Sequence, residues 1–251
     1  MNRSITRRRF FGLGLAGAAA AFVGPGPAWP ADNGGPRLKA RPGKPTQTVK
    51  QGIQQLGLAK GKDGAFSVPK DYDPSKPVPL VMMLHGARGR TEGFDTFLKL
   101  ANDAGAAAVT PDARQQTWDF DLKGYGPDLA FLDRVLEFVF ARVNVDPRHV
   151  AIAGFSDGAS YSLSAGLANG DLFTHILAFS PGFMVPVPRV GKPALWISHG
   201  THDEILPFDN TRQKIVPQLE QWGYKVRFRK FEGKHEVTPD LCKEAFGFVK
   251  A

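Results

Sequence analysis

Short apolar runs alternate with longer segments of helical periodicity along most of this chain. Apolar, β-rich runs predict strands at 78–84, 106–110, 149–154, 174–180, 194–199 and 224–231. Apolar positions at helical spacing predict helices near 92–104 and over 128–145, 157–168, 209–222 and 238–250. This alternation predicts an α/β fold with a mostly parallel central sheet and helices on both faces.

The strongest helical pattern lies at 128–145, where Asp128 is a candidate N-cap. Its apolar face comprises Leu129, Phe131, Leu132, Val135, Leu136, Val139 and Phe140. Upstream, the segments 48–58 and 64–72 are expected to form two antiparallel strands. The folded domain is therefore expected to span residues 47–251.

The N-terminal residues have the features of an export signal. Arg7 and Arg8 precede an aromatic pair, and the weakly apolar run 11–23 is shorter than the roughly 20 residues needed to span a bilayer. Small residues near Ala28 and Ala31 offer peptidase sites. The pattern predicts a twin-arginine (Tat) signal over 1–31, read by the Tat export machinery of a bacterium. An amphipathic helix or an uncleaved anchor is the alternative.

Residues 32–46 are rich in Pro, Gly, Lys and Arg and lack apolar periodicity, which predicts a flexible leader. The mature chain is expected to begin between Trp29 and Asp32. We expect it to be periplasmic or secreted, without a stable membrane anchor. The single cysteine, Cys242, cannot form an internal disulfide, so no disulfide framework is expected.

The positive charge of the chain is concentrated near its N-terminus. The formal net charge is +8, from 32 basic and 24 acidic residues. Residues 1–31 hold four arginines and no acid, which leaves 28 basic against 24 acidic residues, or +4. Residues 32–44 add four basic residues and one acid, so the remainder carries about +1. A nucleic-acid partner is therefore not supported.

The sequence Gly154-Phe155-Ser156-Asp157-Gly158 follows an apolar strand and opens a helical segment. This context is typical of a nucleophile elbow, in which a serine occupies a tight strand-to-helix turn and flanking glycines permit close packing. Ser156 is the candidate nucleophile, and an ordinary helix N-cap is its alternative role.

An acid and a histidine follow at later strand ends. Asp203 comes after the strand 194–199 and His235 after the strand 224–231, in the chain order Ser, Asp, His. His235 would accept the serine proton, and Asp203 would orient His235. Asp203 could instead be a turn residue, with Glu204 or Asp209 as the acid. His235 could be an ordinary surface histidine.

An acyl-transfer site also needs two donors for the developing oxyanion. The backbone N–H of Asp157 is the best candidate, and its partner is expected to be Ala87, or Arg88 if the loop turns one residue later. His85 and Gly86 are expected to shape that loop. A metal site at His85, His199 and His202 lacks any recognised ligand spacing, so neither metal nor cofactor is expected.

Aromatic and other large apolar residues after strand ends could line an acyl pocket. These candidates are Trp118 and Phe183, with Phe120 and Met184 beside them. Such side chains are more often part of the core, which is the alternative for each of them.

Four motifs carry a resemblance to a known family: LHGARG, DPRHVAIAGFSDGAS, HGTHDEILPF and GKHEV. They resemble the phospholipase/carboxylesterase branch of the α/β-hydrolases, and are similar to secreted polyhydroxybutyrate-depolymerase-like esterases. The resemblance covers roughly residues 47–250. It implies the α/β-hydrolase fold and cofactor-free hydrolysis of a small-molecule or oligomeric carboxylic ester through an acyl-enzyme.

Two other functions remain to be separated from ester hydrolysis. A serine peptidase or amidase of the same fold is disfavoured because no propeller or other gating domain precedes the catalytic segment. A catalytically silent binding protein is disfavoured because all three triad positions are filled.

Overall fold

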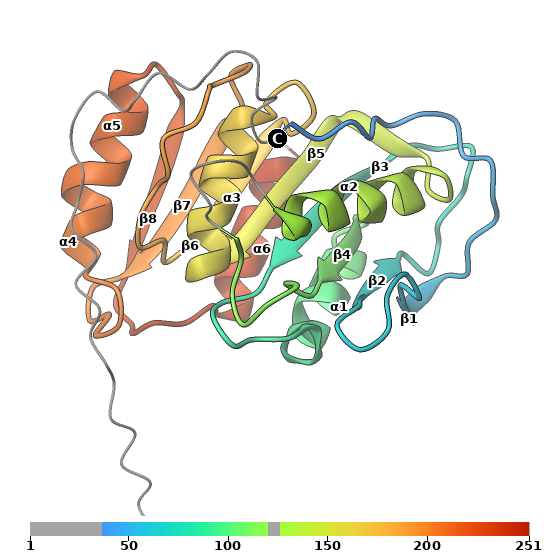
Figure 1. Cartoon of the computed structure of the whole chain (residues 1–251), viewed down its shortest axis with the longest axis horizontal. Helices are drawn as coiled ribbons and strands as arrows, with labels where there is room; N and C mark the ends of the chain where they lie inside the picture. The colour runs from blue at the N-terminus through green and yellow to red at the C-terminus, as the bar shows by residue number, and fades with distance from the viewer. Residues whose placement is uncertain (1–36, 120–125, 251) are drawn as a thin grey trace, which may run out of the picture.

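The computed structural model of the chain describes residues 37–119 and 126–250. These residues form an eight-stranded sheet in the order β1-β2-β4-β3-β5-β6-β7-β8 (Figure 1). Its strands are β1 (Gly52–Gln55), β2 (Gly64–Val68), β3 (Val78–Leu84), β4 (Ala107–Pro111), β5 (Val145–Phe155), β6 (His175–Phe179), β7 (Ala194–Gly200) and β8 (Val226–Phe231). β1 and β2 form the antiparallel pair expected, β2 also runs antiparallel to β4, and all other neighbours are parallel.

Helices cover both faces of the sheet, which confirms the predicted α/β architecture (Figure 1). One face packs against α2 (Pro127–Phe140), α3 (Asp157–Ala168) and α5 (Val216–Gln221). The other packs against α1 (Asp95–Asp103) and α6 (Pro239–Val249). The short 3-10 turn η1 (Thr91–Phe94) precedes α1, while α4 (Phe208–Asn210) and the π-helical turn η2 (Thr211–Ile215) precede α5.

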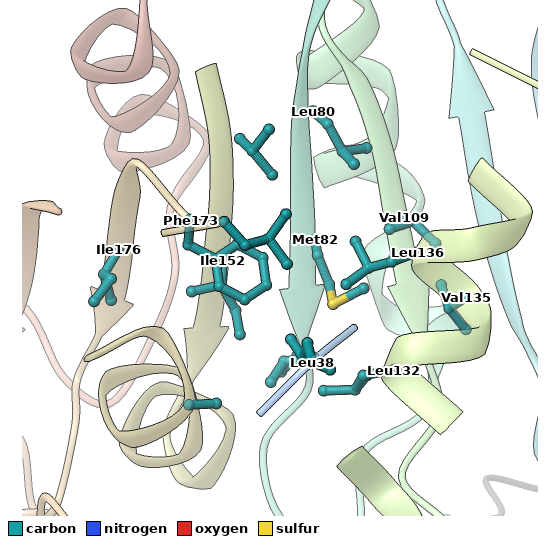
Figure 2. Packing of buried hydrophobic residues seen from close by; sticks show 14 of the residues in the cluster. Leu38, Leu80, Met82, Val109, Leu132, Val135, Leu136, Ile152, Phe173 and Ile176 are labelled. Atoms are coloured by element: carbon teal, nitrogen blue, oxygen red, sulfur yellow. The ribbon is translucent and has the colours of Figure 1, made fainter. Parts of the chain in front are cut away.

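The central strands send alternate side chains to the two faces, and both sets are buried. In β3, Leu80 and Met82 face α2 and α3, whereas Val81 and Met83 face α1 and α6. Figure 2 shows Leu80, Met82 and Ile152 among the side chains of the first cluster. Burial on both faces explains why these strands read as continuous apolar runs in the sequence.

Two of the predicted helices differ from the structure. The helix expected over 128–145 ends at Phe140, because Val145 instead pairs with Val78 at the start of β5. Asp128 is not its cap; Gly126 takes that position, and the Asp128 carboxylate accepts hydrogen bonds from the Arg114 and Asp119 amides. The helix expected over 209–222 is divided into α4, η2 and α5.

Residues 37–46, which we call the N-terminal strap, lie against the domain. The prediction of a flexible leader over 32–46 is therefore wrong for residues 37–46. Leu38 is buried in the main core cluster beside Met82 and Leu132 (Figure 2). Its amide donates to Asn169 Oδ1 at 2.8 Å. Residues 1–36, which include the predicted signal, lie outside the described residues.

The strap has no apolar periodicity, and polar contacts attach it to the domain. Asp133 Oδ1 accepts hydrogen bonds from the amides of Lys39 and Ala40. Arg37 and Arg41 both form ion pairs with Asp171, at 2.6 and 2.7 Å. Two of the basic residues assigned to a mobile leader therefore hold the strap in place.

Cys242 lies in α6 and is buried. Burial raises the pKa of its thiol to about 12, which leaves it protonated and unreactive at neutral pH. The described residues therefore hold no reactive cysteine that could replace Ser156 as a nucleophile.

Candidate active site

Ser156 occupies a sharp turn between β5 and α3. Its backbone lies at φ 57° and ψ −120°, a region that L-residues rarely adopt and that costs about 1 to 3 kcal/mol. The Ser156 amide donates to the Phe179 carbonyl at 2.9 Å, which fixes the turn to β6. The Ser156 side chain makes no capping hydrogen bond to α3, which argues against the N-cap alternative.

Two glycines let α3 pack close enough to form this turn. A Cβ at Gly154 would overlap the Gly158 carbonyl oxygen, and one at Gly158 would overlap the Leu84 carbonyl oxygen. Because both obstacles are backbone atoms, no side-chain movement could relieve them. The glycines flanking Ser156 thus set the position of the serine above β3 and β5.

Asp203 and His235 are in direct contact. His235 Nδ1 lies 2.7 Å from Asp203 Oδ2, and the Asp203 side chain is fully buried. Asp203 Oδ1 accepts the amides of Ile205 and Leu206 at 2.9 and 2.8 Å. Burial by itself would raise the pKa of Asp203, but the hydrogen bonds from Leu206, His235 and Ile205 outweigh it and lower that pKa. The ionised carboxylate can therefore orient His235 and stabilise its charged form.

The alternative acids lie differently. Glu204 and Asp209 are both exposed, and Asp209 pairs with Arg212 at 3.2 Å. His202 is exposed as well, so only Asp203 among these residues is in contact with His235.

Backbone contacts hold the acid and histidine loops together. The amides of Thr201 and His202 donate to the carbonyls of Phe231 and Gly233, each at 2.9 Å. A Cβ at Gly200 would overlap the Gly233 carbonyl oxygen, so glycine at the end of β7 allows this close approach. The geometry of Asp203 and His235 is thereby built into the ends of β7 and β8.

His235 also lies beside the elbow. Its ring packs against that of Phe155, with centroids 4.6 Å apart and planes inclined by 34°. No hydrogen bond joins Ser156 Oγ to His235 Nε2 in the described part of the chain. Catalytic contacts of this kind are often long in free enzymes and shorten in the Michaelis complex.

Two backbone amides are candidates for the oxyanion donors. Asp157 is the first residue of α3, where N–H groups have no intrahelical partner and the helix dipole favours negative charge. Ala87 follows Gly86, which lies against the nucleophile: a Cβ added to Gly86 would be 3.1 Å from Ser156 Cβ. The Arg88 amide donates to the Gln116 carbonyl at 2.6 Å, so of the two alternatives we assign the Ala87 amide to the oxyanion.

His85 shapes the loop 85–90 between β3 and η1, which carries Ala87 and which we call the oxyanion loop. Its Nδ1 lies 2.7 Å from the Gly86 carbonyl, while its Nε2 accepts the Ala113 amide at 2.9 Å. These contacts require a neutral ring protonated at Nδ1, and burial lowers the pKa of His85, which favours that form.

The prediction that Trp118 lines an acyl pocket is wrong. Its ring is only 2 % exposed, and its Nε1 donates to the His85 carbonyl at 2.7 Å. It supports the oxyanion loop from behind, while Met184 packs against the core. Phe183 is 36 % exposed and keeps its place as a pocket candidate. Phe120 lies outside the described residues.

His199 is a functional candidate that the sequence analysis considered only as part of an unsupported metal site. It is fully buried, and its Nε2 lies 3.1 Å from Asp203 Oδ2 and 2.9 Å from the Leu206 carbonyl. Burial lowers the pKa of His199, so its ring is neutral. Since both neighbours of Nε2 are acceptors, the proton lies there, where it donates to the Leu206 carbonyl and lies close to the Asp203 carboxylate. No group of metal-ligating side chains occurs within residues 37–119 and 126–250.

His199→Phe is expected to lower kcat by about 10- to 100-fold, because it removes the polar N–H that lies 3.1 Å from the Asp203 carboxylate, and polar support of a charged group is worth roughly 1.5 to 3 kcal/mol. His199→Gln, which can still donate, should lose less. Steady-state kinetics with His202→Gln as the exposed control will measure this. Wild-type kcat in a folded His199→Phe variant would show that Asp203 needs no such support.

The sequence model described as "Putative esterase" matches residues 61–228, about two thirds of the chain. This stretch includes Ser156 and Asp203 and stops before His235. "Probable feruloyl esterase C" of Aspergillus niger is 26% identical over 171 residues, which cover 64% of this chain and 61% of that protein. "Feruloyl esterase C" of Emericella nidulans is 27% identical over the same coverage. The chain thus spans about three fifths of the length of these relatives.

Solved structures share the fold. S-formylglutathione hydrolase (FrmB) from Staphylococcus aureus superposes with a TM-score of 0.64 and 16% identity, over 78% of this chain and 97% of that one. Esterase PE8 gives a TM-score of 0.63 and 22% identity, over 74% and 97%. At these identities the likeness concerns the fold alone, and it confirms the α/β-hydrolase fold that the motifs implied.

Proposed function

The chain belongs to the Esterase family, and from this premise we propose that it hydrolyses carboxylic esters through an acyl-enzyme on Ser156. The observation that carries the proposal is the strained elbow at Ser156 beside the buried Asp203–His235 pair. A serine hydroxyl becomes an effective nucleophile only when an oriented base accepts its proton.

In the proposed mechanism, Ser156 Oγ attacks the ester carbonyl while His235 Nε2 takes the hydroxyl proton. The amides of Asp157 and Ala87 stabilise the oxyanion of the tetrahedral intermediate. His235 then gives its proton to the departing alkoxide, and the alcohol leaves. Water attacks the acyl-enzyme with His235 as the base, and the acid is released as Ser156 regains its proton. Each step uses these groups, so the mechanism needs no metal or cofactor.

The substrate side of the site is bounded by the 181–193 loop. Ser160 Oγ accepts the amides of Gly182 and Phe183, and Ser164 Oγ accepts the amide of Val185, so α3 holds this loop. We propose that small or oligomeric esters reach Ser156 past Phe183. The names of the curated relatives favour aromatic acyl groups, and the motif resemblance favours hydroxyalkanoate oligomers.

The function is tested by comparing p-nitrophenyl esters with aminoacyl-nitroanilides. Ester turnover that greatly exceeds anilide turnover, with covalent labelling by a fluorophosphonate at Ser156, is the expected result. Faster anilide cleavage would make the protein a peptidase or amidase. The absence of both turnover and labelling would make it a binding protein.

We also propose export by the twin-arginine route to the periplasm or beyond, which rests on Arg7, Arg8 and the short apolar run after them. Among the described residues no helix is both long and apolar enough to cross a membrane. Replacing Arg7 and Arg8 together by Lys should abolish export, as measured by fractionation of a bacterial host. Arg3→Lys is the matched control, and continued export of the double variant would contradict this route.

A further inference from the structure

A cavity of about 370 Å³ lies beside the oxyanion loop. It is lined by Lys62, Arg88, Gly89, Arg90, Gln115 and Gln116. Every charged residue of this lining is cationic, and Gln115 and Gln116 are exposed residues whose amide groups can also donate to an anion. The combination is typical of a site for an anion.

The cavity is structurally tied to the oxyanion donors. Arg88 follows Gly86 by two residues, or at most about 7 Å of chain, and Gly86 touches Ser156. On the other wall, the Gln116 carbonyl accepts the Arg88 amide. Thr117, the next residue, donates to Asp157 Oδ2 at 2.7 Å. The cavity therefore lies next to the loop that carries Ala87 and close to the contact between Thr117 and Asp157.

The three cations differ in how far they are engaged by the protein. Lys62 Nζ donates to the Gln115 carbonyl, and Arg90 lies 3.9 Å from Asp112, a carboxylate only 5 % exposed. Arg88 is exposed, and no hydrogen bond or ion pair engages its guanidinium in the described part of the chain. The backbone of Arg88 adopts φ 57°, a conformation in which glycine would be less strained. An arginine at this position beside the elbow therefore costs free energy of folding.

The positive charge here is local. Outside residues 1–44 the chain carries a net charge of only about +1, so three cations around one cavity are not a consequence of a generally basic surface. Guanidinium groups match the planar geometry of carboxylates and pair with them through two parallel hydrogen bonds.

We propose that this cavity binds a carboxylate of the ester substrate, so that the enzyme prefers esters carrying a free carboxylate over neutral esters of the same shape. The proposal rests on the proposed esterase function and names its substrate class. Arg88 is the principal contact, and Lys62 and Arg90 supply the surrounding positive potential.

Two matched pairs of esters test this preference. Monoethyl adipate against ethyl hexanoate places the carboxylate on the acyl side. The anion para-(butanoyloxy)benzoate against its methyl ester places it on the leaving-group side. At low salt, one pair should show a kcat/KM about tenfold higher for the charged ester, and added salt should narrow this ratio.

The variants Arg88→Gln and Lys62→Gln should each lower the ratio of charged to neutral ester, and Arg88→Glu should bring it below one. Arg227→Gln removes an exposed cation from β8, at the opposite end of the sheet, and should leave the ratio unchanged. The carboxylate proposal is overturned if the charged-to-neutral ratio of kcat/KM is at or below one in both pairs, or if Arg88→Gln does not alter it. Hydrolysis of the neutral esters would still support the esterase function in that case. If neither ester of either pair is hydrolysed, both proposals fail.

Discussion

Ser156→Ala should lower kcat for ester hydrolysis by at least about 10³-fold, because His235 and Asp203 then have no nucleophile to activate and only binding and oxyanion effects remain. Initial rates with p-nitrophenyl butyrate will measure the loss. Fluorophosphonate labelling should disappear together with turnover.

The fold should survive this change. The Ser156 side chain caps no helix, and alanine adopts the strained backbone no less readily than serine does. Thermal unfolding should therefore be close to wild type, with Ser75→Ala as a control at an exposed serine. Turnover near the wild-type rate in a folded Ser156→Ala variant would eliminate the serine mechanism.

Asp203→Asn should lower kcat by about 10²- to 10⁴-fold while Glu204→Gln and Asp209→Asn remain near wild type. The amide is neutral, so it cannot stabilise the charged imidazole of His235, and its NH₂ group can force the wrong tautomer. In this site His235 and two backbone amides donate hydrogen bonds to the Asp203 carboxylate, and His199 Nε2 lies 3.1 Å from it.

Kinetics of the three variants at one pH, with circular dichroism as a check on folding, will decide the identity of the acid. If Asp203→Asn keeps full activity and one of the other two loses it, the acid has been assigned to the wrong residue. Equal losses in all three would indicate a general effect of the loop on folding.

The central elements could be predicted from local sequence because each of their patterns is compatible with only one type of secondary structure. The strand 78–84 and the helix 157–168 match β3 and α3, since an apolar run of that length and a glycine-flanked elbow each allow one structure. The helix predicted over 128–145 is too long because Val143 continues its apolar face. Pairing of Val145 with Val78, a contact distant in sequence, ends it.

The features that the sequence did not predict depend on contacts between distant residues. Trp118 is an aromatic residue after a strand end, and only the position of the His85 carbonyl shows that it supports a loop. His199 and Asp203 are four residues apart in the sequence. This spacing could have suggested a contact, because both residues lie at or just after the end of one predicted strand. The strap has no periodicity at all, and its partners lie 93 to 134 residues further along the chain.

The last of these contacts has a consequence for the order in which the protein is built. The strap is made before Asp133, Asn169 and Asp171, so during synthesis it has nothing to bind until α2 and α3 have emerged and packed. It therefore settles only after α2 and α3 have formed, although it leaves the ribosome before both of them. In the sequence, only residues 32–36 separate the strap from the predicted signal over 1–31. A peptidase that cleaved at the predicted site would therefore act within a few residues of a segment that is bound to the folded domain.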